Sequence, residues 1–122
     1  MHNYKNLKIW QRSMDIVEII YRETATFPKE EKYSLTSQIR RASSSIPSNI
    51  AEGASRESKK EFSYFLSIAL GSCYELNTQI ELSKRLSIIT LETTDKIHQE
   101  LDEVEKMIAG LIKTINKQHL KP

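Results

Sequence analysis

Apolar side chains in the second half of the chain recur in two long series with alternating steps of four and three residues. The first series consists of Phe62, Leu66, Ala69, Cys73, Leu76 and Ile80. The second consists of Ile97, Leu101, Val104, Ile108, Leu111 and Ile115. This spacing keeps the apolar side chains on one face of an α-helix, as in helices that pack along their whole length. The two series predict helices over about residues 59–85 and 92–118.

The first half of the chain predicts two more helices, over about residues 7–26 and 35–54. In the first of these, the apolar positions with helical spacing are Trp10, Met14, Val17 and Tyr21. In the second they are Leu35, Ile39, Ala42, Ile46, Ile50 and Gly53. Pro47 lies inside the second pattern and removes one backbone hydrogen bond. We expect a kink there rather than a break, because the apolar period continues through the proline.

Residues that favour helix ends lie between these segments. Pro28 disfavours α geometry in the residue before it and ends the first helix, and the polar residues 29–34 predict a loop. Gly53 begins the stop signal of the second helix. Ser58 and Glu61 match a capping box, in which two side chains reciprocally bind free backbone N–H groups at the start of a helix.

Four helices joined by short connections predict an all-α fold, an antiparallel up-down-up-down four-helix bundle that spans residues 1–122 as a single domain. The composition agrees, since the chain has only three Gly and three Pro, on which the frequent turns of β-sandwiches depend. No apolar run of about 18 residues is present to cross a membrane, and the first residues lack the apolar stretch of a signal peptide. We therefore expect a cytoplasmic protein with no membrane association.

A local excess of positive charge is the main candidate for binding chemistry. The chain has 18 Lys and Arg against 16 Asp and Glu, and a net charge of +2 is too small to indicate nucleic-acid binding by itself. Residues 35–60, however, hold more cations than carboxylates, and these cations are Arg40, Arg41, Arg56, Lys59 and Lys60. Such side chains can neutralise phosphates. The alternative is a set of charges that are solvated or paired with Glu52, Glu57 and Glu75.

Residues suited to catalysis or metal binding are few. Cys73 is the only cysteine, so it can form no disulfide within the chain, and its place in the apolar series predicts a buried thiol. His98 shares a predicted helix face with Asp95 and Asp102, but a di-iron bundle needs two Glu-x-x-His motifs and two further Glu residues. No phosphate-binding glycine loop is present. We therefore expect no catalytic residue, no metal site and no cofactor.

Two helix faces that point away from the predicted core indicate contact with other copies of the chain. The helix over residues 59–85 carries a second series opposite Ala69, which consists of Tyr64, Ile68, Gly71, Glu75 and Leu82. The helix over residues 35–54 has only small outward side chains, at Ser44, Ser45, Ser48 and Ala51, and these allow another helix to approach closely. We interpret the seven residues Ser44, Ser45, Ser48, Tyr64, Ile68, Gly71 and Glu75 as an oligomer interface. The alternative is a polar surface with a few apolar residues, which is normal on any protein.

Several short motifs in the chain resemble one known family. The most specific are residues 38–42 and 45–53 followed by Arg56, and further similarity lies at residues 7–11 and 61–76. These stretches resemble the four-helix bundle proteins encoded by intervening sequences in 23S rRNA. The resemblance implies a homopentamer that has no established activity and is not an enzyme. That family is also similar to the accessory protein of diversity-generating retroelements, a positively charged pentamer that binds nucleic acid and a reverse transcriptase.

These observations favour one function and leave another open. The leading hypothesis is a non-enzymatic, homo-oligomeric bundle that binds structured nucleic acid, RNA or DNA, through phosphate contacts made by its repeated basic residues. The competing hypothesis is a scaffold whose oligomer binds a protein partner such as a reverse transcriptase. We interpret the central motif as a signature of fold and assembly, with direct RNA contact by Arg40 or Arg41 as the alternative.

Overall fold

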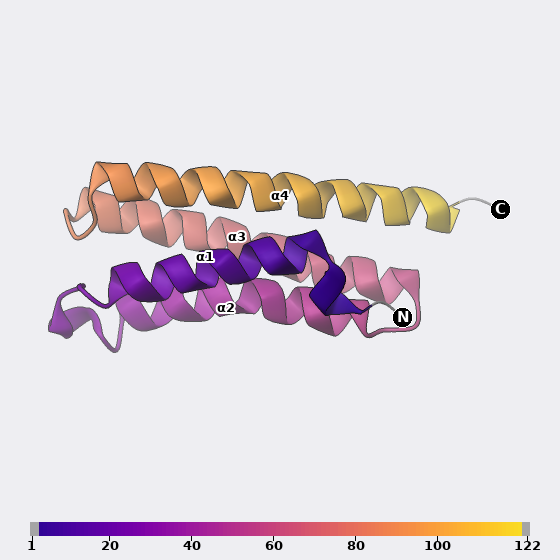
Figure 1. Cartoon of the computed structure of the whole chain (residues 1–122), viewed down its shortest axis with the longest axis horizontal. Coiled ribbons are helices and arrows are strands. Elements are labelled where there is room, and N and C mark those ends of the chain that lie inside the picture. The colour runs from indigo at the N-terminus through magenta and orange to yellow at the C-terminus, as the bar shows by residue number, and fades with distance from the viewer. Residues whose placement is uncertain (1–2, 121–122) are drawn as a thin grey trace.

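The computed structural model describes residues 3–120, and within them every regular element is a helix. The elements are η1 (Tyr4–Asn6), α1 (Lys8–Thr24), η2 (Lys29–Glu31), α2 (Leu35–Ala54), α3 (Lys59–Arg85) and α4 (Leu91–Leu120), where η marks a short 3-10 helix. Figure 1 shows the α-helices side by side along one axis, with the chain reversing direction at each connection. The predicted antiparallel four-helix bundle is therefore confirmed. None of the described helices combines the length and the apolar character that crossing a bilayer requires.

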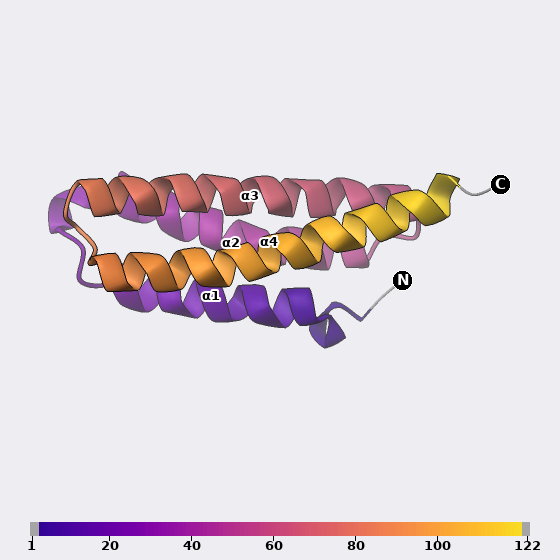
Figure 2. The same ribbon diagram turned by 90° about the horizontal axis from the view of Figure 1, so that it is seen from above.

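The α-helices form a square in which each one packs against two neighbours. α2 packs against α1 and α3, and α4 completes the square by packing against α3 and, less extensively, against α1. Figure 2 shows α4 beside α1 near the N-terminal end of α4 and diverging from it toward the C-terminal end. The bundle is thus tightest along α2 and α3.

The side chains inside the square are largely those of the predicted apolar series. On α3, the whole series from Phe62 to Ile80 is buried. On α4 the series is buried except for Leu111, which is half-buried at the edge of the core. The predicted core positions of α2 are all buried as well. The spacing of four and three residues therefore predicted the core faces of these three helices correctly.

The predicted core face of α1 is wrong by one position. The buried residues of α1 are Ile9, Ser13, Ile16, Ile20 and Thr24. Met14 and Tyr21, which belong to the predicted series, are 37% and 45% exposed. The hydroxyls of Ser13 and Thr24 donate to backbone carbonyls one turn earlier in α1, at 2.9 and 2.7 Å. A small hydroxyl residue whose donor is satisfied within its own helix can occupy a core position. Because such residues are polar, the apolar periodicity of the sequence does not reveal the core face of a helix that contains them.

Side chains near the helix ends satisfy backbone groups. The Ser58 hydroxyl accepts a hydrogen bond from the Glu61 backbone N–H at 3.1 Å and donates one to the Glu61 carboxylate at 3.3 Å. The predicted residues therefore do cap the N-terminal end of α3. α1 ends at Thr24, slightly earlier than predicted, and the predicted loop at residues 29–34 contains the short helix η2.

The C-terminal end of α2 is packed closely against α3. α2 is one helix through Pro47, and Gly53 lies inside it rather than acting as the stop signal that the sequence suggested. A Cβ at residue 53 would lie 2.8 Å from the Cβ of Phe65 and 3.0 Å from the ring of Phe62. Real Cβ atoms do not approach other atoms so closely, so any larger residue would push α2 and α3 apart.

We expect Gly53→Ala to lower the free energy of unfolding by roughly 1–3 kcal/mol, because the added methyl group has to displace Phe65. Gly110→Ala is the matched control, since a Cβ there meets no atom within 4 Å. Replacing this exposed helical glycine should raise the free energy of unfolding by roughly 0.5–1 kcal/mol. Urea denaturation followed by circular dichroism measures both variants, and effects of the same sign and size would contradict the packing role of Gly53.

Candidate nucleic-acid interface

The five predicted basic residues lie at two separate places on the bundle. Arg40 and Arg41 belong to the first half of α2, whereas Arg56, Lys59 and Lys60 lie at the connection between α2 and α3. The helical segment between the two groups is roughly 20 Å long at 1.5 Å per residue. The structure therefore does not bring the five cations into one cluster, and the contacts of each group have to be described separately.

The group at the α2–α3 connection is largely engaged within the molecule. Arg56 pairs with the carboxylate of Glu52 one turn earlier, and its guanidinium lies 5.0 Å from the centre of the Phe65 ring. Lys59 donates a hydrogen bond at 2.8 Å to an amide side chain of α4. Lys60 is exposed and makes no hydrogen bond or ion pair within residues 3–120. The alternative of pairing with an acidic neighbour is therefore correct for Arg56.

Arg40 joins α2 to the C-terminal end of α1 through uncharged partners. Its Nε donates to the Thr24 hydroxyl at 2.8 Å, and a terminal nitrogen donates to the backbone carbonyl of Tyr21 at 3.3 Å. The guanidinium carbon also lies 4.6 Å from the centre of the Tyr21 ring, a cation–π distance. None of these partners is a carboxylate, so the positive charge of Arg40 is held in place without being neutralised.

Arg40 and the exposed Arg41 line one pocket at the end of the bundle where α1, η2 and α2 meet, at the left of Figure 1. The pocket has a volume of about 460 Å³ and is lined by Tyr21, Lys32, Tyr33, Thr36, Ser37, Arg40, Arg41 and Ser44. We call it the basic–aromatic pocket. Three of these side chains are cations and none of them is a carboxylate. Lys32 and Arg40 also line an adjoining pocket together with Lys29, again without a carboxylate.

Sequence reasoning missed the part that Tyr21, Lys32 and Tyr33 take in this pocket. The predicted series on the first helix places Tyr21 in the core, and the polar residues 29–34 predict only a loop. In the structure, this segment returns the chain beside α2, and Lys32 Nζ lies 5.4 Å from the centre of the Tyr33 ring. The signal that could have indicated the pocket is the adjacent lysine and tyrosine shortly before two consecutive arginines.

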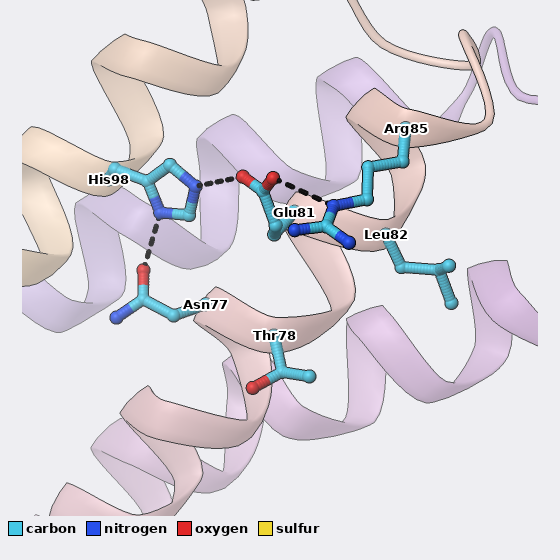
Figure 3. Close-up of a pocket in the computed structure, with 6 residues that line it drawn as sticks. All are labelled: Asn77, Thr78, Glu81, Leu82, Arg85 and His98. Carbon is cyan, nitrogen blue, oxygen red and sulfur yellow. Dashed lines mark hydrogen bonds and ion pairs between the residues drawn. The ribbon is translucent and has the colours of Figure 1, made fainter.

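A second pocket, of about 600 Å³, lies on α3 beside His98 of α4, and its charges are paired (Figure 3). His98 Nδ1 lies 2.7 Å from the Asn77 side-chain oxygen, and His98 Nε2 lies 3.8 Å from the Glu81 carboxylate. Arg85 Nε donates to the same carboxylate at 3.2 Å, and this hydrogen bond lowers the pKa of Glu81. The guanidinium of Arg85 and the carboxylate of Glu81 in this pocket are therefore paired with each other.

His98 contacts α3 rather than the acidic residues Asp95 and Asp102 of its own helix. Among the side chains that the structure describes, residues 3–118, no three from His, Cys, Asp or Glu are arranged to hold a metal ion. His98 therefore acts in this structure as a link between α3 and α4.

Asn77, the hydrogen-bond partner of His98, also contacts Glu105 in a partly buried region of the α3–α4 interface. The Asn77 amide nitrogen donates to the Glu105 carboxylate at 2.5 Å, while burial raises the pKa of Glu105. Burial, together with the charge of Glu105, raises the pKa of the Cys73 thiol to about 12. Because the thiolate is the reactive form of cysteine, this thiol is a poor nucleophile at neutral pH.

A family model described as the 23S rRNA-intervening sequence protein matches residues 5–110. The chain belongs to this family. A crystal structure with a similar fold is that of a protein with unknown function from the S23 ribosomal protein family from Bacteroides thetaiotaomicron. It is 27% identical, with a TM-score of 0.78, and the match covers 86% of this chain and 98% of that one. No protein with a curated description is significantly similar to the chain.

The motif that resembles the family, residues 45–53, makes contacts within the bundle. The Ser45 and Ser72 hydroxyls lie 2.8 Å apart and join α2 to α3. Asn49 donates to both the carbonyl and the hydroxyl of Ser45, at 2.8 and 2.9 Å. Gly53 allows the close approach to α3, and Glu52 pairs with the arginine one turn later. These contacts support the interpretation of the motif as a signature of the family fold.

The predicted interface residues of α2 lie in two settings. Ser45 is half-buried and hydrogen-bonded to α3, so its small size serves packing within the chain rather than an outer contact. Ser44 and Ser48 border a groove of about 330 Å³ between α1 and α2, together with Trp10 and Met14. Of the apolar series that the sequence assigned to the core of the first helix, Trp10, Met14 and Val17 line this groove.

The predicted interface residues of α3 lie on its outer face. The Tyr64 and Ile68 side chains are 63% and 37% exposed. Gly71 is exposed as well and has open space around the position of a Cβ. Glu75 is exposed and accepts a hydrogen bond from Gln79 one turn later. These residues form the outer stripe of α3 on which the proposal of self-association below is based.

We expect Cys73 to resist thiol-reactive reagents while the bundle is folded. At pH 9.0, the ordinary pKa of a thiol, a pKa of about 12 leaves a thiolate fraction of about 0.1%. Ser67→Cys in a Cys73→Ser background is the control, because it places the thiol on the exposed side of α3. Absorbance of the released chromophore should show labelling of the control that is faster by at least about a hundredfold, because a thiol of ordinary pKa is about half ionised at this pH. Equal rates in folded protein would contradict the burial of Cys73.

Proposed function

We propose that this protein is a non-enzymatic homo-oligomer that binds structured RNA. The basic–aromatic pocket of each subunit binds phosphate groups of the RNA. The observation that carries the proposal is the charge of the pocket, where Lys32, Arg40 and Arg41 stand without a lining carboxylate. Many cations elsewhere are paired, as in Arg12–Glu100, Arg22–Glu18, Arg85–Glu81 and Lys106–Asp102. Unpaired cations gathered at one place attract an external anion.

Nucleic-acid phosphates are the anions that this arrangement suits best. Each phosphate that a lysine or arginine neutralises releases a condensed counterion, so binding strengthens with the number of contacts and weakens with salt. One pocket offers only a few such contacts. An oligomer repeats the pocket in every subunit, and the combined binding to one RNA can exceed the affinity of a single pocket by orders of magnitude.

The outer stripe of α3 supports self-association. Tyr64, Ile68 and Leu82 expose large apolar side chains there, and Gly71 permits close approach of another backbone. Burying such side chains against a second copy is favourable, by roughly 25 cal/mol for each Å² of apolar surface removed from water. The family resemblance implies five subunits.

One observation favours a different function. The groove between α1 and α2 is lined by Tyr4, Trp10, Met14, Val17, Ser44, Pro47, Ser48 and Ala51. Its aromatic and apolar side chains suit a protein segment better than a phosphate backbone. A scaffold that binds a protein partner, such as a reverse transcriptase, is therefore the second candidate.

We expect Arg41→Glu to weaken binding of a structured RNA at every salt concentration, because it removes a cation that no group of the chain neutralises. The slope of log K against log salt should fall in magnitude by about 0.9 for each duplex phosphate contact that is lost. Lys106→Glu is the control with a similar charge change on α4, where the lysine is already paired with Asp102. Fluorescence anisotropy of a labelled RNA measures both, and equal losses would contradict the proposed site.

We expect light scattering to show a species several times larger than the 14.1 kDa chain, because the outer stripe of α3 is apolar. Ile68→Glu should disperse that species by placing a charge in the contact. Leu91→Glu is the control, since Leu91 is 60% exposed at the start of α4, away from the stripe. A wild-type monomer at micromolar concentration, or dispersal by both variants, would contradict self-association through α3.

A further inference from the structure

Tyr33 is the more exposed of the two aromatic side chains in the basic–aromatic pocket. Its relative exposure is 88%, compared with 45% for Tyr21. Lys32 Nζ lies over one face of the Tyr33 ring, 5.4 Å from its centre. The high exposure leaves the other face of the ring open, and an open aromatic face is a surface on which a nucleic-acid base can stack.

The other side of the pocket presents a second flat surface. The Arg40 guanidinium lies against the Tyr21 ring and is oriented by its hydrogen bonds to Thr24 and to the Tyr21 carbonyl. Bases stack on guanidinium planes as well as on aromatic rings. A base that enters the pocket therefore meets planar groups from both α1 and α2.

We propose that the pocket binds an unpaired nucleotide of the RNA, with its base stacked on Tyr33 and its phosphate held by Arg41 and Lys32. A volume of about 460 Å³ lies in the range of small-ligand sites. Bases inside a double helix are stacked on one another and cannot reach Tyr33, whereas those in loops, bulges and ends can. This inference rests on the proposed function and adds a preference for single-stranded elements.

The test compares two RNAs with the same number of phosphates, a hairpin with an unpaired loop and a fully paired duplex. Fluorescence anisotropy at one salt concentration should show that the wild-type protein prefers the hairpin. Tyr33→Ala should weaken hairpin binding by roughly fivefold to a hundredfold, the range for loss of one stacked base, and leave duplex binding unchanged. Tyr33→Phe keeps the ring and should retain hairpin affinity.

A further variant separates stacking from general effects. Tyr74→Ala removes a tyrosine that is 53% exposed on α3, outside the pocket, and should change neither affinity. Light scattering checks that each variant keeps the wild-type assembly.

The outcomes distinguish this inference from the proposed function on which it rests. Salt-dependent binding of both RNAs with equal affinity, unchanged in Tyr33→Ala, would overturn the inference and leave phosphate binding in place. Binding of neither RNA by the wild-type protein would overturn both. Equal weakening of hairpin and duplex binding by Tyr33→Ala would also overturn the inference, since the Tyr33 ring would then contribute to RNA binding whether or not unpaired bases are present.

Discussion

The close contact between α2 and α3 is the constraint on which the rest of the bundle depends. At one end, Gly53 allows the backbone of α2 to lie against the aromatic residues of α3. Near the middle, Ser45 and Ser72 meet through their hydroxyls, so both small side chains keep the helices near and their polar atoms satisfied. Once these two helices are held together, α1 and α4 can close the square only along their remaining faces. The position of α2 in turn determines where its first-half cations stand relative to the end of α1.

Charge is arranged differently in the two helical hairpins. Between α3 and α4, Asn77 and Glu81 connect His98 to further polar side chains, and Arg85 pairs with Glu81. Where α1, η2 and α2 meet, the partners of Arg40 are a hydroxyl, a carbonyl and an aromatic ring. A nearly neutral chain therefore holds three cations in one pocket without a lining carboxylate, which its net charge of +2 does not reveal.

The fold was largely predictable because every turn of a long helix in a bundle places an apolar side chain in the core. In α3 and α4 this requirement recurs over many turns, so one position with a small or less apolar residue does not obscure the helical period. The same reasoning failed for α1, where Ser13 and Thr24 occupy core positions although they are polar. Met14 and Tyr21, each one residue after a buried position, are 37% and 45% exposed. The basic–aromatic pocket was only half predictable. Its arginines are adjacent on a helix, but Lys32 reaches them through a chain reversal whose path no local pattern specifies.

The hydrogen bonds of Arg40 have a consequence for how readily this end of the molecule can receive a ligand. A free arginine samples many rotamers, and immobilising such a side chain on binding costs about 0.5–1.5 kcal/mol. Here Thr24 and the Tyr21 carbonyl have already restricted the guanidinium before any partner arrives. The conformational entropy of Arg40 is thus lost during folding, and this pre-organisation lowers the entropic cost of binding a ligand at this wall of the pocket.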